Sequence, residues 1–164
     1  MPSELDRDTY RGLIGQFATG VTVVTTNVDG RLHGMTANAV CSLSLEPLQL
    51  LVCVDRESNC YQQMQRAEAF GLSILASDQE EISNVFARTT EPAAGSLLGI
   101  AFRQGGLGEP LIENALVHIE CRIAERIDGG DHIIVIGDVV AGERLRDAEP
   151  LLFHGGRYAR LTAG

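Results

Sequence analysis

The chain of 164 residues has a formal net charge of -9, and its whole positive inventory is 13 arginines, because it contains no lysine. An acidic chain opposes the attraction to phosphate on which nucleic-acid binding depends, so we expect no nucleic-acid partner. The absence of lysine excludes Schiff-base chemistry, and with it pyridoxal phosphate enzymes, as well as lysine-dependent phosphate loops.

The length and the 45% content of hydrophobic residues fit a single domain over residues 1–164. The first sixteen residues lack the apolar core of a signal peptide, and no later apolar run reaches the roughly 18 residues of a membrane span. We therefore expect a cytoplasmic protein without membrane association. Four cysteines lack Cys-x-x-Cys spacing and lie mostly in apolar strand patterns, which predicts buried reduced thiols and no metal site: Cys41, Cys53, Cys60 and Cys121.

The first part of the chain predicts a short helix followed by a β-hairpin. Apolar residues at helical spacing favour an amphipathic helix over 8–16, which would lie over one end of a barrel. β-Branched residues over 21–26 favour a strand, and Asp29-Gly30 is typical of a tight hairpin turn. The returning run 34–39 consists largely of small, hydroxyl and amide residues, which allow the backbone to approach a flat ligand closely.

The middle of the chain predicts three more strands and two helices. Residues 40–45 continue as a strand, and the apolar run 50–54 predicts a strand that is buried on both faces. A helix is expected over 59–67 with Ser58 as its N-cap, and a strand over 70–75. Ser77 and Glu80 have the spacing of a capping box, which would open a further helix through Phe86. Residues 88–110 are rich in glycine, proline and alanine and predict a functional loop or lid.

The last part of the chain predicts a long hairpin. Residues 117–123 alternate with the apolar side chains on one face, and His118, Glu120 and Arg122 on the other. A turn over 128–131 leads into 133–141, which is apolar on both faces, and a short strand is expected at 158–161. Such strands, with two or three short helices and no βαβ alternation, predict a mainly β, antiparallel barrel. The two-faced apolar runs also indicate a homodimer interface.

Three runs in this order carry a resemblance to a known family: Thr19-Gly20-Val21-Thr22-Val23-Val24-Thr25-Thr26, Gly34-Met35-Thr36-Ala37-Asn38 and Ser42-Leu43-Ser44-Leu45-Glu46-Pro47. Together with Gly130-Asp131-His132 and Gly156-Arg157-Tyr158, they resemble the signature of the flavin reductase-like family. The resemblance implies an antiparallel split β-barrel of the FMN-binding type, homodimerisation, and a flavin site near the subunit boundary. It also implies hydride transfer from NADH or NADPH to FMN, with FAD as the alternative, in the service of a flavin-dependent monooxygenase.

The residues offer a polar edge for the flavin ring and an anchor for its phosphate. Candidates for the ring edge are Thr36, Asn38, Ser42 and the backbone of Ala37, Ala39, Val40 and Cys41. Thr19, Thr22 and Thr25 are placed alongside, on the argument that strand residues of like parity share a face. Arg56 and Ser58 at a helix N-terminus form an expected phosphate site, against the alternative that Arg56 pairs with Asp55 or Glu57 on the surface.

His132 is the candidate catalytic residue, because a glycine-rich turn would present its imidazole at the barrel mouth. The resemblance implies a position beside the nicotinamide; the alternative is a histidine satisfied by Asp131 or solvent. His33 and His118 are expected to be structural or exposed. Hydride transfer needs alignment more than a general base, so the lack of a catalytic triad does not exclude an enzyme. Two rivals stay open: a non-catalytic FMN-binding or electron-carrier protein on the same barrel, and a plain antiparallel domain without cofactor.

Overall fold

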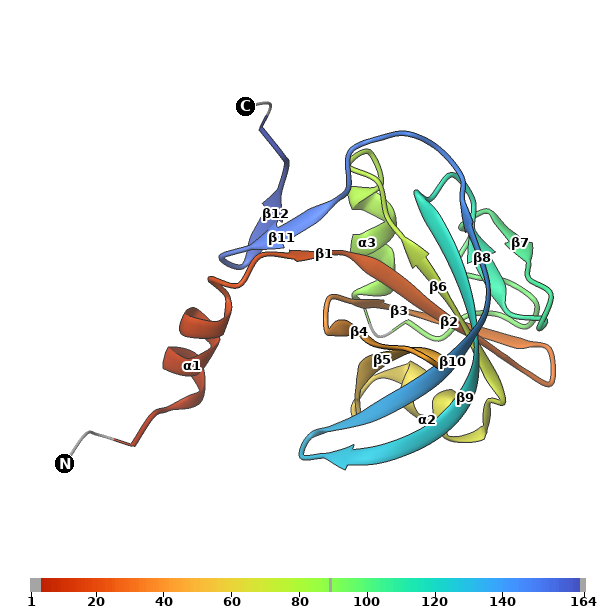
Figure 1. Cartoon of the computed structure of the whole chain (residues 1–164), viewed down its shortest axis with the longest axis horizontal. Helices are drawn as coiled ribbons and strands as arrows, with labels where there is room; N and C mark the ends of the chain where they lie inside the picture. Colours follow the sequence, from red (N-terminus) through yellow and green to blue (C-terminus); the bar gives the residue numbers. More distant parts are fainter. Residues whose placement is uncertain (1–3, 89, 163–164) are drawn as a thin grey trace.

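The protein is described by a computed structural model, which covers residues 4–88 and 90–162. Within these residues it is mainly β, and every strand pairing is antiparallel, as the sequence predicts. The largest sheet has seven strands in the order β3-β2-β6-β9-β10-β5-β4, so β3 and β4 form its edges (Figure 1). Its strands are β2 (Thr22–Val28), β3 (Arg31–Ala37), β4 (Val40–Leu45), β5 (Leu48–Asp55), β6 (Ala69–Ile74), β9 (Val117–Gly129) and β10 (His132–Arg144).

Two small sheets and three short helices complete the described chain. One small sheet has the order β1-β11-β12 and the other pairs β7 with β8. Their strands are β1 (Thr19–Gly20), β7 (Phe102–Gln104), β8 (Pro110–Ile112), β11 (Leu152–His154) and β12 (Arg157–Ala159), and the helices are α1 (Arg7–Ile14), α2 (Asn59–Arg66) and α3 (Glu80–Phe86). Throughout the described ranges, no helix is both long and apolar enough to cross a membrane.

The core lies between the large sheet and two of the helices. Val52 and Val54 of β5, Phe70 of β6 and Val135 of β10 pack with Met64 of α2, and all five are fully buried. A second cluster gathers around Phe86 of α3, with side chains from β2 and β8 and from the segments that flank them. β-Branched side chains suit such a half-buried pleated surface, which explains why the strand predictions succeeded.

The two predicted turns are confirmed. Asp29 and Gly30 both have positive φ, at 54° and 81°, and join β2 to β3. Gly130, with φ of 75°, joins β9 to β10. Glycine adopts positive φ readily and aspartate tolerates it, so the local sequence predicts the position of both hairpins.

The N-terminal helix forms where the sequence predicts it but does not cover the sheets. α1 projects from the body (Figure 1), and none of its residues is buried. Phe17, just beyond it, is 74% exposed. The backbone N–H of Gly155 donates to the carbonyl of Gly15 at 2.8 Å and ties the helix end to the β11–β12 turn. The apolar stripe of α1 is therefore largely exposed.

Bonds to distant backbone groups decide the outcome of several local predictions. α3 begins at Glu80, not after a capping box at Ser77, since the N–H of Ser77 donates to the carbonyl of Glu149 at 2.8 Å. Ser58 is the N-cap residue of α2, as predicted, but its hydroxyl donates to the carbonyl of Asp55 at 2.8 Å and not to the helix. His118 has the structural role that was one of its two expected roles: it is buried, with Nε2 donating to the carbonyl of Ile112 at 2.6 Å, although its neighbours on that face are polar. The predicted loop or lid over 88–110 includes strand β7.

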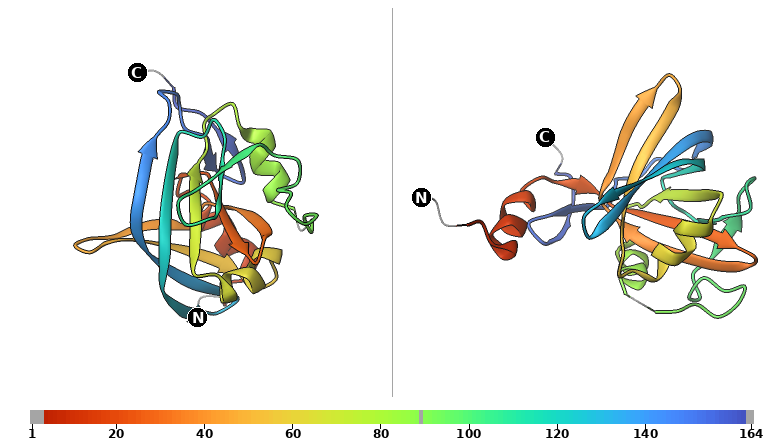
Figure 2. Two further views of the ribbon diagram at one scale, coloured as in Figure 1. Left: turned by 90° about the vertical axis from the view of Figure 1, so that its right-hand side faces the viewer. Right: turned by 90° about the horizontal axis from the view of Figure 1, so that it is seen from below.

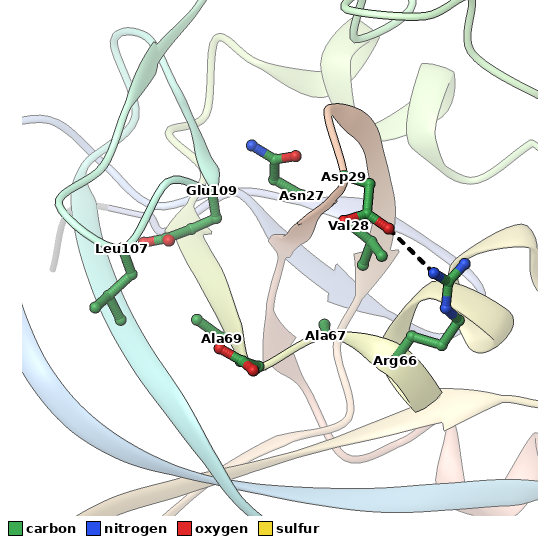
Figure 3. A pocket seen from close by; sticks show the side chains of 9 residues that line it. Asn27, Val28, Asp29, Arg66, Ala67, Ala69, Leu107 and Glu109 are labelled. Carbon is green, nitrogen blue, oxygen red and sulfur yellow. Dashed lines mark hydrogen bonds and ion pairs between the residues drawn. The ribbon is translucent and has the colours of Figure 1, made fainter.

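A buried carboxyl group lies against a cavity of about 430 Å³ between the β2–β3 turn, the end of α2 and the start of β6 (Figure 3). Glu109 is 1% exposed, and neither of its carboxylate oxygens has a hydrogen-bond partner among the described residues. A Cβ on Gly105 would lie 2.8 Å from Glu109 Oε1 and 2.7 Å from Glu120 Oε1, so the two acids are close. Burial, with a further contribution from Glu120, raises the pKa of Glu109 to about 7.

The raised pKa predicts a stability that falls as pH rises. Between pH 4.5 and about 7, the unfolded chain has lost the Glu109 proton while the folded protein keeps it, so this contribution is present below pH 4.5 and lost through pH 7. Glu109→Gln is expected to flatten the profile and to raise Tm at pH 8 by roughly 3–10 °C, since it removes an unpaired buried charge. Thermal unfolding at pH 5.5 and 8.0 measures this.

The matched control is Glu113→Gln, which removes an equal charge from an exposed position. It should leave the pH profile of Tm unchanged. Equal pH profiles for wild type and Glu109→Gln would show that Glu109 has an ordinary pKa.

Candidate functional site

A cavity of about 990 Å³ opens where three distant parts of the chain meet. The first is the end of α1 with the segment that leads into β1. The second is the β3–β4 corner together with β4 and β5. The third is the β11–β12 hairpin. We call this cavity the corner pocket; its lining residues are Arg11, Ile14, Gly15, Phe17, Ala18, Thr19, Gly20, Thr22, Asn38, Ala39, Val40, Cys41, Leu51, Cys53, Ile74, Phe153 and Gly156.

The floor of the corner pocket is the second face of β5. Leu50, Val52 and Val54 point into the core, whereas Leu51 and Cys53 alternate with them and line the pocket. The prediction that this strand is buried on both faces was therefore wrong for the second face. An apolar strand face that is not covered by protein suits a flat, largely apolar ligand.

Six of the predicted flavin-binding residues line the corner pocket: Thr19, Thr22, Asn38, Ala39, Val40 and Cys41. The Thr19 hydroxyl is buried and has no hydrogen-bond partner among the described residues. A buried unpaired hydroxyl costs free energy unless a ligand or water satisfies it. Thr22, in contrast, donates its hydroxyl hydrogen to the carbonyl of Ala37 at 2.7 Å and holds the β3–β4 corner against β2.

Four other predicted residues do not line the corner pocket. Thr25 is fully buried in the core, where its hydroxyl donates to the carbonyl of Pro110. The prediction that Thr25 shares a strand face with Thr22 was wrong, because the two residues are three positions apart and face opposite sides of β2. Thr36 donates to the carbonyl of Ser83 in α3 at 2.6 Å, Ala37 is buried, and Ser42 is exposed beyond the lining.

Arg56 and His132 lie at the β9–β10 turn and Ser58 lies at the start of α2, and none of the three lines the corner pocket. Arg56 pairs with Asp128, donates from Nε to the carbonyl of Gly130 at 3.0 Å, and contacts Tyr61 Oη at 3.0 Å. The surface alternative named Asp55 or Glu57 as its partner, and the observed partner is Asp128. Asp128 is also what raises the pKa of Arg56. The guanidinium and the turn therefore form one polar cluster.

His132 faces the same side of the sheet as the pocket floor. It is paired with Asp55 across β10 and β5, and the next pair on that face is Ile134 with Cys53. Directly opposite residues share a face, so His132 lies roughly 7 Å along the strand from the floor. Its Nδ1 is 2.7 Å from the carboxylate of Asp131, and this bond lowers the pKa of Asp131. Sequence reasoning named that bond as the alternative role of His132.

The sequence analysis missed the contribution of both chain ends to the corner pocket. Arg11, Ile14 and Phe17 come from the N-terminal segment, and Phe153 and Gly156 from the β11–β12 hairpin. In the described ranges, Arg11 is the only charged side chain of the lining. The sequence feature that could have indicated the contribution of the N-terminal segment is its amphipathic helix, which carries Arg11 in its last turn. The described residues contain no cluster of three potential metal ligands.

Comparison with known proteins confirms the family resemblance along almost the whole chain. The model of the flavin reductase like domain matches residues 14–162. The reductase subunit HsaB of a flavin-dependent monooxygenase from Mycobacterium tuberculosis is 36% identical over 163 residues, which cover 98% of this chain and 86% of HsaB. An NADH-dependent FAD reductase from Streptomyces globisporus is 37% identical over 167 residues, covering 98% of this chain and 91% of that protein.

The fold agrees with a solved structure of the same class. The NADH:FAD oxidoreductase SgcE6 of Streptomyces globisporus superposes with a TM-score of 0.91 at 36% identity, covering 100% of both chains. The family model spans most of the chain, and the sequence relatives cover nearly all of it. The protein therefore belongs to the flavin reductase-like domain family.

Proposed function

We propose that the protein is a flavin reductase that transfers a hydride from NADH to a flavin and supplies the reduced flavin to a monooxygenase. The observation that carries this function is the corner pocket, which combines an apolar floor with a polar rim and lacks an acid–base pair. Its relatives include an NADH-dependent FAD reductase and a monooxygenase reductase subunit. Flavin supplies the hydride acceptor in this chemistry, and the protein contributes binding and alignment.

The donors of the pocket fit a flavin. The unpaired hydroxyl of Thr19, the amide of Asn38 and the backbone over 38–41 would hold the polar edge of the ring. Leu51 and Cys53 would cover its apolar face and exclude water. We propose FMN or FAD as the flavin, and NADH as the reductant with NADPH as the alternative. Arg56 and Ser58 would hold the phosphate of the flavin. Thr25 lies in the core and is not part of the proposed site.

The test is oxidation of NADH, followed at 340 nm with and without added FMN or FAD. Flavin-dependent steady turnover is the expected result. Tight yellow binding without turnover would instead indicate the electron-carrier alternative, and neither binding nor turnover would indicate a domain without cofactor. Repeating the assay with NADPH sets the preference between the two nicotinamides.

We further propose that the sheets form a split barrel and that the protein is a homodimer acting in the cytoplasm. Large apolar side chains are exposed on two projecting elements, α1 and the β4–β5 hairpin (Figure 2): Tyr10, Leu13, Ile14, Leu43, Leu45 and Leu48. Large apolar groups exposed on projecting elements are typical of an interface. Four free cysteines fit a reducing compartment. Sedimentation at micromolar concentration tests the dimer, and a monomeric mass would contradict it.

His132→Ala is expected to raise KM for NADH or to lower kcat by about tenfold, a change of roughly 1.4 kcal/mol in transition-state binding. Flavin affinity should change much less, because His132 lies beyond the lining of the corner pocket. Steady-state kinetics with varied NADH, together with flavin titration, separate the two effects. Unchanged NADH kinetics would leave His132 with only its bond to Asp131, and loss of flavin binding alone would assign it to the other ligand.

Arg56→Gln is expected to weaken binding of FMN by roughly 10–100-fold, because charge-assisted hydrogen bonds are worth about 1.5–3 kcal/mol. Binding of riboflavin, which has no phosphate, should be unchanged. Arg11→Gln is the matched variant, since it removes the charge from the lining of the corner pocket. If Arg11→Gln, and not Arg56→Gln, separates FMN from riboflavin in fluorescence titrations, the phosphate lies at α1 and the Arg56 assignment fails.

A further inference from the structure

Two of the four cysteines line the corner pocket. Cys41 of β4 is exposed and Cys53 of β5 is half-buried, and both line the pocket. The other two, Cys60 and Cys121, are buried, and burial raises the pKa of each of these thiols to about 12. The sequence pattern predicted four buried thiols, and the structure instead separates an inert pair from an accessible pair.

The two accessible thiols are diagonal neighbours on one sheet face. Cys41 is paired with Leu51, and the N–H of Cys53 donates to the carbonyl of Ala39 at 3.0 Å, so Cys53 lies opposite Ala39. Diagonal neighbours have Cα atoms roughly 7–8 Å apart. Their proximity is also seen in the pKa of Cys53, which is raised by burial and further by a charge on Cys41.

A bond between the two sulfur atoms requires only a small shift of β4. Disulfides need a Cα separation of about 4.4–6.8 Å, so β4 must move by roughly 1 Å toward Cys53. β4 is an edge strand, and its pairing with β5 already shifts register between Ser42 and Ser44. Within one protomer, no described strand lies outside β4.

We propose that hydrogen peroxide oxidises Cys41 and Cys53 to a disulfide, and that the oxidised pocket no longer accepts flavin. This inference rests on the proposed function, because reduced flavin that meets dioxygen before a monooxygenase yields hydrogen peroxide at the enzyme itself. Formation of the disulfide thereby stops flavin reduction when the reduced flavin reacts with dioxygen before it reaches the monooxygenase. A dithiol reductant restores the two thiols and the pocket.

The two steps balance without a further reactant. The Cys41 thiolate attacks one oxygen of the peroxide: an S–O bond forms, the O–O bond breaks, and the leaving hydroxide takes a proton to become water. Cys53 then attacks the sulfenic sulfur of Cys41: the S–S bond forms, the S–O bond breaks, and a second water leaves. The two thiols lose two electrons and two protons, and the peroxide becomes two waters. Cys41 reacts first because it is exposed.

The first arm of the test is mass spectrometry of the full-length protein. Trypsin cleaves after Arg31 and Arg56 and at no residue between them, so one peptide, 32–56, contains both thiols. After treatment with about ten equivalents of hydrogen peroxide and quenching with catalase, this peptide should lose about 2 Da. A gain of oxygen on Cys41 alone, or no change in mass, would overturn the proposal.

The second arm measures flavin binding and NADH oxidation before and after peroxide. Flavin affinity should fall at least tenfold on treatment and recover with dithiothreitol. For Cys41→Ser and Cys53→Ser, the ratio of treated to untreated affinity should stay near one. A disulfide that leaves affinity unchanged would also overturn the proposal. Activity of the untreated protein is measured first, so that failure of the flavin reductase function is seen separately from failure of the thiol pair.

Discussion

Ala39→Phe is expected to lower flavin affinity at least about 100-fold, or roughly 2.8 kcal/mol, and to abolish turnover at micromolar flavin. Ala39 is a small residue in the lining of the corner pocket, opposite Cys53 of its floor. A phenyl ring there would occupy the space that the ligand needs. The backbone carbonyl of Ala39, which accepts the bond from Cys53, would be retained.

The matched control is Ala124→Phe, an equal change at an exposed position of β9 outside the pocket. Flavin titration and NADH oxidation should be unaffected in this variant, and Tm should be similar in both. Full activity of Ala39→Phe would show that flavin binds elsewhere, and the β9–β10 turn around Arg56 and His132 would become the first alternative.

Gly137→Val is expected to destabilise the fold by about 3 kcal/mol, since overpacking a close-packed core forces strain into its neighbours. A Cβ at Gly137 would lie 2.7 Å from the ring of Phe70 and 2.7 Å from Cβ of Cys121, and both side chains are fully buried. The expected fall in Tm is roughly 6–12 °C. Thermal unfolding followed by circular dichroism measures it.

Gly142→Val is the control for the same strand. Its Cβ would lie 3.5 Å from the nearest atom, the carbonyl oxygen of His118, which is an ordinary contact. Its Tm should therefore remain close to that of the wild type. A similar Tm for Gly137→Val would mean that Phe70 can move aside and that the core is less tightly packed than the distances indicate.

The sequence predicted features that depend on local chemistry. The Asp29-Gly30 turn requires positive φ at adjacent residues, and the hairpin follows directly. The small and polar run before Cys41 also indicated the wall of the pocket. These signals lie within a few residues of each other and need no distant partner.

Features that depend on distant partners were not predictable in this way. The apolar face of β5 with Leu51 and Cys53 has the same pattern whether core or ligand covers it. His118 is buried only because a carbonyl of β8 lies within its reach. The end of α1 is tied to the β11–β12 turn by a backbone bond from Gly155 to Gly15, which neither segment indicates in its sequence.

The corner pocket is lined by residues from near both ends of the chain, Arg11 and Gly156 among them. It can therefore form only when synthesis of the chain is almost complete. A chain still emerging from the ribosome lacks the β11–β12 wall, even after the large sheet has been made. Ligand binding in the corner pocket can therefore stabilise the finished protein but not the sheet of the nascent chain.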